Sequence, residues 1–85
     1  MQYKHITHQA ITTDYRVDRN GNGYIFAKCR AKKIRRPFDS NLNLTNNSYQ
    51  VAVELCQLLG WPIDLVGGSL PGPRFTQVWV HLPQA

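Results

Sequence analysis

The chain has 85 residues, which is enough for one domain and too few for two. Hydrophobic residues make up 42% of it, which argues against disorder along the whole chain. Ten Lys and Arg residues against five acidic ones give a formal net charge of +5. This balance favours an anionic partner such as nucleic acid, an acidic protein face or a phospholipid surface, although the charge also serves solubility.

The sequence also bears on location and stability. The N-terminal residues MQYKHITHQA contain no apolar signal region, and no stretch approaches the roughly 20 apolar residues of a membrane span. Cys29 and Cys56 form no disulfide framework, so we expect a cytoplasmic protein with reduced thiols and no contact with a membrane. A core this small leaves only about 3–5 kcal/mol of net stability, and homodimerisation is one way to increase it.

Residues 6–19 and 24–36 are predicted to form two antiparallel strands. Both are rich in β-branched and aromatic residues, and the Asn-Gly repeat at 20–23 between them is typical of a hairpin turn. Pairing Val17 with Ile25 puts the apolar residues of both strands on one face and leaves a three-residue loop at 20–22. In this register Asp14 lies opposite Lys28. The predicted buried set is Ile11, Thr13, Tyr15, Val17, Ile25, Ala27, Cys29 and Ala31.

One helix is predicted to follow a polar, Asn-rich turn at residues 38–47. Asn47 is the expected N-cap, and Gly60 is the expected end of the helix. Residues 63–66 and 75–82 are predicted to form a second hairpin around a loop at 67–73. The predicted fold is therefore α+β, in the order ββαββ. It is an antiparallel sheet with one helix packed on one face, and residues 1–85 form a single domain.

Two segments resemble ligand-binding motifs. Residues 18–25 resemble the first eight positions of an EF-hand calcium loop, but Cys29 stands where that family needs a bidentate Glu. We interpret this segment as a hairpin turn. Gly67-Gly68-Ser69 lacks the Lys-Ser/Thr pair that completes a phosphate-binding loop, and it is interpreted as a flexible hairpin loop.

Catalytic and metal sites are not expected. His5 and His8 would point to opposite faces of a strand, and His81 is distant in the sequence. The serines and the acidic residues form no recognisable arrangement of nucleophile, base and orienting group. The sequence therefore predicts no metal, no cofactor and no enzymatic activity.

The strongest functional signal is the basic segment from Lys28 to Arg36, predicted to lie within one strand. Lys and Arg neutralise phosphates, aromatic rings stack on unpaired bases, and a two-stranded ribbon can enter the major groove. An edge strand protected by lysines is the alternative, but the segment has more charge than such protection needs. The candidate binding residues are Phe26, Lys28, Arg30, Lys32, Lys33, Arg35 and Arg36.

The predicted register ranks these candidates. It places Lys28, Arg30 and Lys32 on the face opposite the helix, with Phe26 beside them. Asp14 is expected to neutralise part of the charge of Lys28. The best candidates are therefore Arg30, Lys32, Arg35 and Arg36.

In its size, its predicted ββαββ order and its lack of catalytic motifs, the whole chain resembles small accessory proteins of phages and other mobile elements, including some anti-CRISPR proteins. The resemblance is one of type and involves no shared motif. Many such inhibitors are acidic mimics of nucleic acid, and a charge of +5 departs from that pattern. The first hypothesis is a non-catalytic protein whose basic strand contacts nucleic acid. The second is a phage-encoded inhibitor, acting in the host cytoplasm, that binds a CRISPR-Cas-type defence or another nucleic-acid-handling complex.

Overall fold

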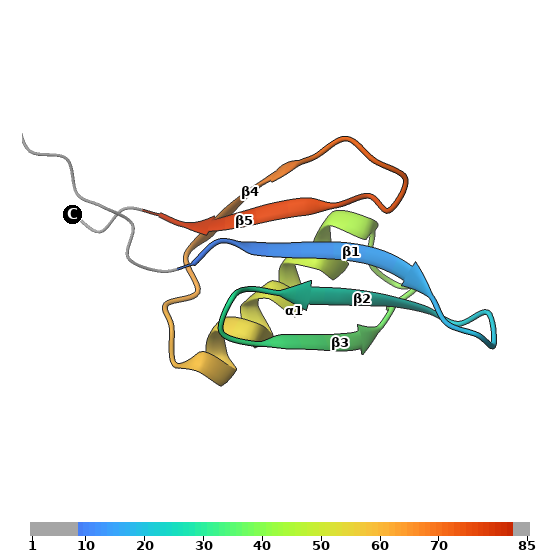
Figure 1. Cartoon of the computed structure of the whole chain (residues 1–85), viewed down its shortest axis with the longest axis horizontal. Coiled ribbons are helices and arrows are strands. Elements are labelled where there is room, and N and C mark those ends of the chain that lie inside the picture. Colours follow the sequence, from blue (N-terminus) through green and yellow to red (C-terminus); the bar gives the residue numbers. More distant parts are fainter. Residues whose placement is uncertain (1–8, 83–85) are drawn as a thin grey trace, which may run out of the picture.

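A computed structural model describes residues 9–82. The elements are β1 (Ile11–Val17), β2 (Gly23–Lys28), β3 (Lys33–Pro37), α1 (Leu44–Leu59), β4 (Leu65–Ser69) and β5 (Gln77–His81). The strands form one antiparallel sheet in the order β3-β2-β1-β5-β4, and α1 lies across one of its faces (Figure 1). The predicted α+β class is confirmed. The order differs from ββαββ by one additional strand before the helix.

The additional strand arises because residues 24–36 form a hairpin and not the single strand that the sequence predicts. β2 ends at Lys28, Arg30 and Ala31 form the tip, and β3 returns from Lys33. The backbone N–H of Cys29 donates to the carbonyl of Lys32 across the tip, at 2.9 Å. No Gly, Asn, Asp or Pro marks this turn, so the residue types gave no signal of it.

β1 and β2 pair two residues away from the predicted register. Tyr15 lies opposite Ile25, and Val17 lies opposite Gly23. A shift of two residues keeps every side chain on its predicted face, because side chains alternate along a strand. The inward-facing positions of β1 and β2 were therefore predicted correctly, whereas the cross-strand partners were not. Two residues of the predicted buried set are exposed: Val17, at the end of β1, is 56% exposed, and Ala31 lies at the tip of the turn that follows β2.

The register shift lengthens the loop between β1 and β2 to the five residues 18–22, where three were predicted. Asp18 stabilises this longer loop, because its Oδ1 accepts hydrogen bonds from the backbone N–H groups of Asn20 and Asn22, both at 2.9 Å. Gly21 has φ = +85°, a conformation that glycine adopts without a steric penalty. The interpretation of this segment as a hairpin turn is confirmed.

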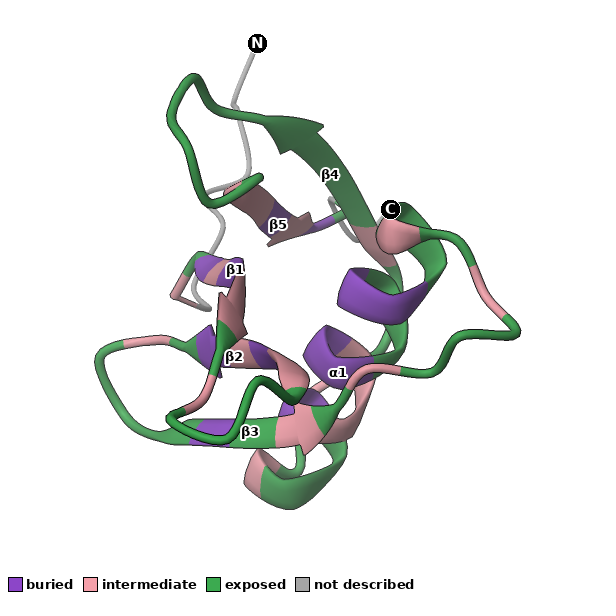
Figure 2. Cartoon of the chain, turned by 90° about the vertical axis from the view of Figure 1, so that its right-hand side faces the viewer, coloured by how far each residue is buried: buried purple, intermediate pink, exposed green. Residues whose placement is uncertain are grey.

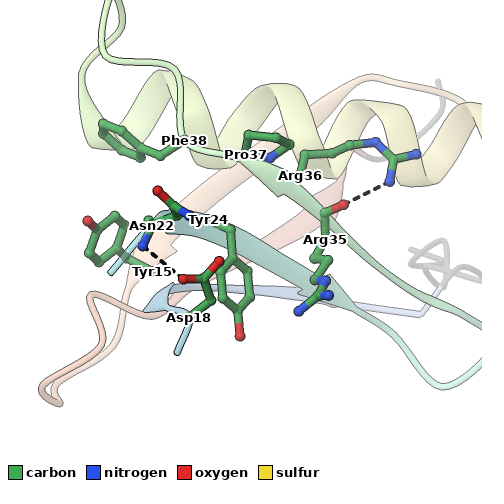
Figure 3. Close-up of a pocket in the computed structure, with 9 residues that line it drawn as sticks. Tyr15, Asp18, Asn22, Tyr24, Arg35, Arg36, Pro37 and Phe38 are labelled. Atoms are coloured by element: carbon green, nitrogen blue, oxygen red, sulfur yellow. Dashed lines mark hydrogen bonds between the residues drawn. The ribbon is translucent and has the colours of Figure 1, made fainter. Parts of the chain in front are cut away.

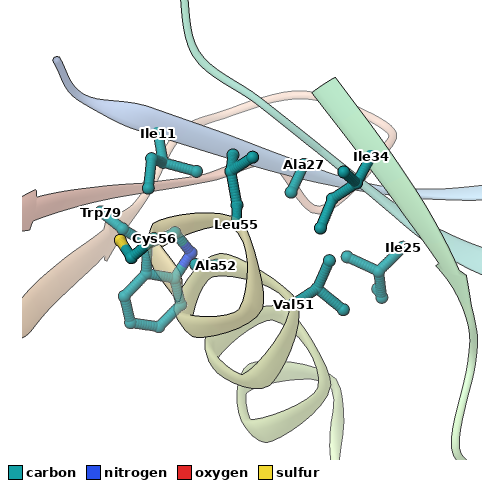
Figure 4. Packing of buried hydrophobic residues seen from close by; sticks show 9 residues of the cluster. All are labelled: Ile11, Ile25, Ala27, Ile34, Val51, Ala52, Leu55, Cys56 and Trp79. Atoms are coloured by element: carbon teal, nitrogen blue, oxygen red, sulfur yellow. The ribbon is translucent and has the colours of Figure 1, made fainter. Parts of the chain in front are cut away.

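The hydrophobic core lies between α1 and the neighbouring face of the sheet (Figure 4). Burial of one Val, Leu or Ile side chain stabilises a fold by about 1.5–3 kcal/mol. Trp79 also donates from Nε1 to Oγ1 of Thr13 at 3.1 Å, which ties the last strand to the first inside the core. The buried hydrophobic residues are Ile11, Ile25, Ala27, Ile34, Val51, Ala52, Leu55, Cys56 and Trp79.

Helix α1 begins one turn before its predicted start. Asn43 is the N-cap, and its Oδ1 accepts from the backbone N–H of Asn46 at 2.7 Å. Asn47, the predicted N-cap, is buried inside the helix, where its amide bonds to backbone groups in residues 39–43. The predicted end of the helix is confirmed, because Gly60 has φ = +71° at the C-cap.

The second hairpin is present, but its loop lies at residues 70–76, between β4 and β5, and not at 67–73 as predicted. Gly67, Gly68 and Ser69 pair with β5 as part of β4, so their interpretation as a flexible hairpin loop is wrong. Trp79 and His81 of β5 are buried, and Val78 and Val80, which point to the other face, are partly buried. β4 lies at the outer edge of the sheet, and all of its residues after Leu65 are exposed (Figure 2). The helix thus supports the β3 side of the sheet much more than the β4 side.

Candidate functional site

The face of the sheet opposite α1 carries a group of cationic and aromatic side chains, which we call the basic face. Within β2–β3, Lys28 lies opposite Lys33, and Phe26 lies opposite Arg35. Side-chain alternation places all of these residues on the face that the helix does not cover. The basic face consists of Arg16, Tyr24, Phe26, Lys28, Lys33 and Arg35.

Lys28 and Lys33 form a close pair of like charges. The backbone bond from Cys29 to Lys32 marks a hydrogen-bonded position of this ladder, so Lys28 and Lys33 occupy the adjacent non-hydrogen-bonded position. The Cα atoms of such a pair lie about 4.5 Å apart. Both side chains are exposed, and like charges directly opposite each other destabilise a sheet. A bound anion would relieve that repulsion.

Asp14 does not lie opposite Lys28, so that part of the predicted register is wrong. Its cross-strand partner is Phe26. The carboxylate accepts hydrogen bonds from Nη2 of Arg16 at 3.0 Å and from Oγ1 of Thr76 at 2.5 Å. Asp14 is therefore held by Arg16 and acts on Lys28 only through space.

Burial alone would raise the pKa of the Asp14 carboxyl group. The hydrogen bonds from Thr76 and Arg16, together with the positive charges of Arg16 and Lys28, outweigh burial and lower this pKa below its ordinary value. Asp14 is consequently ionised at neutral pH, and its charge is balanced mainly by Arg16.

Two arginines of the basic face contact its aromatic rings. Cζ of Arg16 lies 4.3 Å from the ring centroid of Phe26, and Cζ of Arg35 lies 5.3 Å from that of Tyr24. Each cation–π contact at an exposed site contributes about 0.5–1 kcal/mol. These contacts hold cationic groups and aromatic surfaces side by side.

A groove of about 570 Å³ adjoins the basic face where the loop at 18–22 meets the end of β3 (Figure 3). Tyr24 and Arg35 line it from the basic face, and Tyr15 and Phe38 line its other wall. Its volume lies within the range of pockets that bind small molecules. The lining residues are Tyr15, Asp18, Asn22, Gly23, Tyr24, Arg35, Arg36, Pro37 and Phe38.

Asp18, the acidic residue of this groove, already accepts hydrogen bonds from the backbone of its own loop. The backbone hydrogen bond from Asn22 contributes most to lowering the pKa of Asp18, a slight burial opposes it, and Asn20 and the charge of Arg35 lower it further. Oδ1 of Asp18 accepts from the loop amides, and Arg35 has no carboxylate partner within hydrogen-bond distance among residues 9–82.

A smaller apolar hollow of about 200 Å³ shares Tyr15 and Phe38 with the groove. Tyr15 and Phe38 meet edge to face in it, with ring centroids 5.3 Å apart. Leu44 and Phe75 complete its lining. Phe75 is 60% exposed and has φ = +54°, a conformation that costs a non-glycine residue about 1–3 kcal/mol. An exposed aromatic side chain is thus held at one end of the site.

The other predicted site residues lie off the basic face. Arg36 points toward α1, where its guanidinium group bonds both carboxylate oxygens of Glu54 at 2.9 Å. Arg30 and Lys32 are exposed at the hairpin tip and not on the strand face beside Lys28, so that part of the prediction is wrong. The chain turns after Cys29, and this turn ends the alternation on which that prediction depends.

The sequence-predicted candidates omit Arg16 and Tyr24 of the basic face, Phe75 of the apolar hollow and most of the groove lining. Tyr24 precedes Phe26 by two positions, and Arg16 falls on the same face by alternation, so both carried a signal in the sequence. Phe75 carried none, because its exposure depends on the backbone conformation of the loop at 70–76.

The polar groups inside the core serve the fold. Burial raises the pKa of the Cys56 thiol, which makes it a poor nucleophile. Nε2 of His81 lies 2.8 Å from the carbonyl oxygen of Pro62, and a carbonyl only accepts, so Nε2 carries the proton.

Within residues 9–82, no three His, Cys, Asp or Glu side chains gather as metal ligands would. His5 and His8 lie outside the described residues.

No helix within residues 9–82 is long and apolar enough to cross a membrane. Comparison of the chain with protein-family models, with curated proteins and with solved structures found no match.

Proposed function

We propose that this protein binds single-stranded nucleic acid on its basic face, without catalysing a reaction. The observation that supports this proposal most strongly is the facing pair Lys28 and Lys33, directly beside the Arg–aromatic contacts of the same face. Proteins that bind single strands combine a cationic surface for the backbone with aromatic rings for the bases.

The phosphates would be neutralised by cations that have no ion pair among the described residues. The two ion pairs of residues 9–82 are Arg16 with Asp14 and Arg36 with Glu54. Lys28, Lys33 and Arg35 remain for a ligand, and the hairpin tip adds Arg30 and Lys32. Charge therefore extends from the strand face to the tip of one hairpin.

The bases would stack on or between the rings of the basic face. Tyr24 and Phe26 are partly exposed, and Tyr24 also lines the groove. Stacking of one base on an aromatic side chain contributes about 1–3 kcal/mol and needs an unpaired base. This requirement favours a single strand over a duplex as the ligand.

Fluorescence anisotropy with single- and double-stranded DNA and RNA, measured over a salt series, tests the proposal. The double variant Lys28→Ala/Lys33→Ala should bind single strands about tenfold more weakly at low salt. It should also reduce the slope of log K against log salt by about 1.4, since each phosphate contact to a single strand contributes about 0.7.

The matched control is Arg19→Ala/Arg74→Ala, which removes the same charge from two exposed loop positions. It should leave the salt slope near that of the wild type. The proposal is overturned if no nucleic acid binds at low salt, or if both double variants lose the same affinity.

The aromatic part of the proposal has its own test. Tyr24→Leu keeps an apolar side chain but removes the stacking surface, and it should weaken binding of single strands about fivefold or more. Tyr49→Leu is the control. Tyr49 is an exposed tyrosine of α1 that contacts the ring of Trp79, on the side of the sheet opposite the basic face. Equal effects of the two changes would contradict stacking on Tyr24.

A pull-down from bacterial lysate, with and without nuclease, separates nucleic acid from a protein partner. Under our proposal, nuclease treatment removes the co-purified material. A protein partner that survives nuclease would instead support an inhibitor of a nucleic-acid-handling complex, such as a phage-encoded inhibitor of a CRISPR-Cas-type defence.

A further inference from the structure

The outer edge of β4 is uncovered. β4 is the last strand of the sheet, and among residues 9–82 no further strand pairs with it. Its side chains are exposed from Val66 onward, and the hydrophobic residues Val66 and Leu70 are 49% and 47% exposed (Figure 2). An exposed edge of this kind is a template for pairing with another strand.

The backbone groups that point outward from this edge can be identified. Leu70 donates its N–H to Thr76 of the same hairpin, and the carbonyl of Asp64 accepts from Leu82. Even-numbered residues of this segment therefore bond toward β5. Because the bonding direction alternates along a strand, the N–H and C=O groups of Leu65, Gly67 and Ser69 point away from the sheet.

This edge lacks two of the usual protections against pairing, which are charged side chains and proline. Residues 65–70, with the sequence LVGGSL, contain no charged residue and no proline. A chain of charge +5 thus leaves one of its two edge strands without charge, at the side of the sheet farthest from the basic hairpin. The occupant of this edge is accordingly a neutral, hydrogen-bonding strand and not a polyanion.

We propose that β4 pairs antiparallel with β4 of a second copy of this chain, about a two-fold axis through Gly67. In that register Leu65 of one copy exchanges backbone hydrogen bonds with Ser69 of the other, and the two Gly67 residues exchange them with each other. All three outward-pointing residues are satisfied in both copies, because their positions are symmetric about Gly67. The result is a continuous sheet of ten strands, five from each copy.

The charge distribution favours this partner. β3 and β4 are opposite edges of the sheet, so pairing through β4 places the two basic hairpins at the far ends of the dimer. Nine inter-strand spacings of about 4.8 Å separate the two β3 strands, or roughly 43 Å. At that distance, several Debye lengths at physiological salt, repulsion between the hairpins is largely screened.

Sedimentation velocity and amide hydrogen exchange, both without nucleic acid, test the dimer independently of the proposed function. As protein concentration rises, the sedimenting mass should double. The amides of Leu65, Gly67 and Ser69 should gain protection over the same concentration range. The amide of Leu70, already bonded to Thr76, should be protected at every concentration.

Ser69→Pro removes one outward N–H without removing a bond to β5, and it should abolish dimerisation. Ser40→Pro, in the turn closed by the bond from Leu42 to Asp39, is the matched control and should leave the dimer intact. Val66→Lys should likewise disrupt the dimer, whereas Val17→Lys, which adds the same charge at an exposed residue near the loop at 18–22, should not.

The proposal is overturned if the chain stays monomeric at all concentrations. It is also overturned if protection of Leu65, Gly67 and Ser69 does not depend on concentration, because another segment of the same chain would then cover the edge. A dimer that tolerates Ser69→Pro would show that the contact lies elsewhere.

Discussion

The two edge strands, β3 and β4, are held in the sheet by different interactions. β3 packs Ile34 into the core, bonds Arg36 to Glu54 of the helix, and carries Lys33, Arg35 and Pro37 on its exposed positions. β4 contributes only the partly buried Leu65 to the helix side, and Gly67 makes room there for the ring of Trp79. One edge is anchored and charged, and the other is weakly anchored and neutral.

This difference shows how a small protein can give each edge of one sheet a separate role. The charges and the proline of β3 discourage pairing with another strand, while those same charges suit an anionic ligand. β4 has the free backbone groups that pairing requires. The stability of each edge should therefore respond to different substitutions.

The largest expected effect concerns the anchoring of β3. Ile34→Ala removes a buried side chain from the core and should lower the free energy of unfolding by about 2–4 kcal/mol. Val66→Ala in β4 removes a half-exposed side chain and should cost about 0.5 kcal/mol or less. Urea denaturation at low protein concentration measures both, and equal losses would contradict the proposed difference between the edges.

The next effect tests how β4 is held. A Cβ atom at Gly67 would overlap the Trp79 ring, so Gly67→Ala should destabilise the fold by about 1–3 kcal/mol. Gly68→Ala is the control, since a Cβ there meets no atom within 4 Å and φ is not positive. It should change stability by no more than about 0.5 kcal/mol. Near-ultraviolet circular dichroism of Trp79 should change only in the Gly67 variant.

A smaller effect concerns Asp14, which joins β1 to the end of the β4–β5 loop through Thr76. Its folded pKa lies below the ordinary value of 3.8, so the unfolded chain binds the proton more readily. The stabilisation is therefore complete above about pH 5 and is lost as the pH falls through the folded pKa. Asp14→Asn should cost about 1 kcal/mol at pH 7 and make the loss of stability below pH 5 shallower.

Thr76→Val removes one of the hydrogen bonds that lower the pKa of Asp14 while keeping the shape of the side chain. This change should also make the loss of stability below pH 5 shallower, but by less than Asp14→Asn does. Urea denaturation from pH 7 to pH 2 makes the comparison. An Asp14→Asn profile parallel to that of the wild type would refute this role of Asp14.

The smallest effect concerns the ion pair that joins β3 to the helix. Arg36 and Glu54 are each about 40% exposed, so a double-mutant cycle to alanine should give a coupling of roughly 0.5 kcal/mol. Arg35→Ala, at the neighbouring residue on the basic face, should cost no more than the roughly 0.5–1 kcal/mol of its contact with Tyr24, but it should reduce binding of nucleic acid. If Arg36→Ala reduced binding as strongly as Arg35→Ala, our assignment of faces would be wrong.

Alternation and capping carried most of what the sequence could predict. The period of two placed Ile25 and Ala27 in the core and Phe26 and Lys28 outside it, even though the pairing register was shifted. Gly60 marked the end of the helix because its positive φ is a local requirement.

The remaining features depend on contacts between distant segments. The turn after Cys29 is held partly by Gln9, whose side chain accepts from the N–H of Ala31, and no residue type in the turn announces it. The Asp14 carboxylate is engaged by Thr76, which is 62 positions away in the sequence. The sequence therefore predicted which types of residue form the candidate site, but the way these residues are arranged in space could be seen only in the structure.

The central position of β1 has a consequence for biosynthesis. β1 pairs on one side with β2, which follows it closely, and on the other with β5, the last strand of the chain. During translation β1 must wait for its second neighbour until residues 77–81 have left the ribosome, and Thr13 meets Trp79 only then. The helix and the β2–β3 hairpin can form earlier, because their contacts are local. We therefore expect one edge of β1 to stay unpaired on the nascent chain until the last strand has been made.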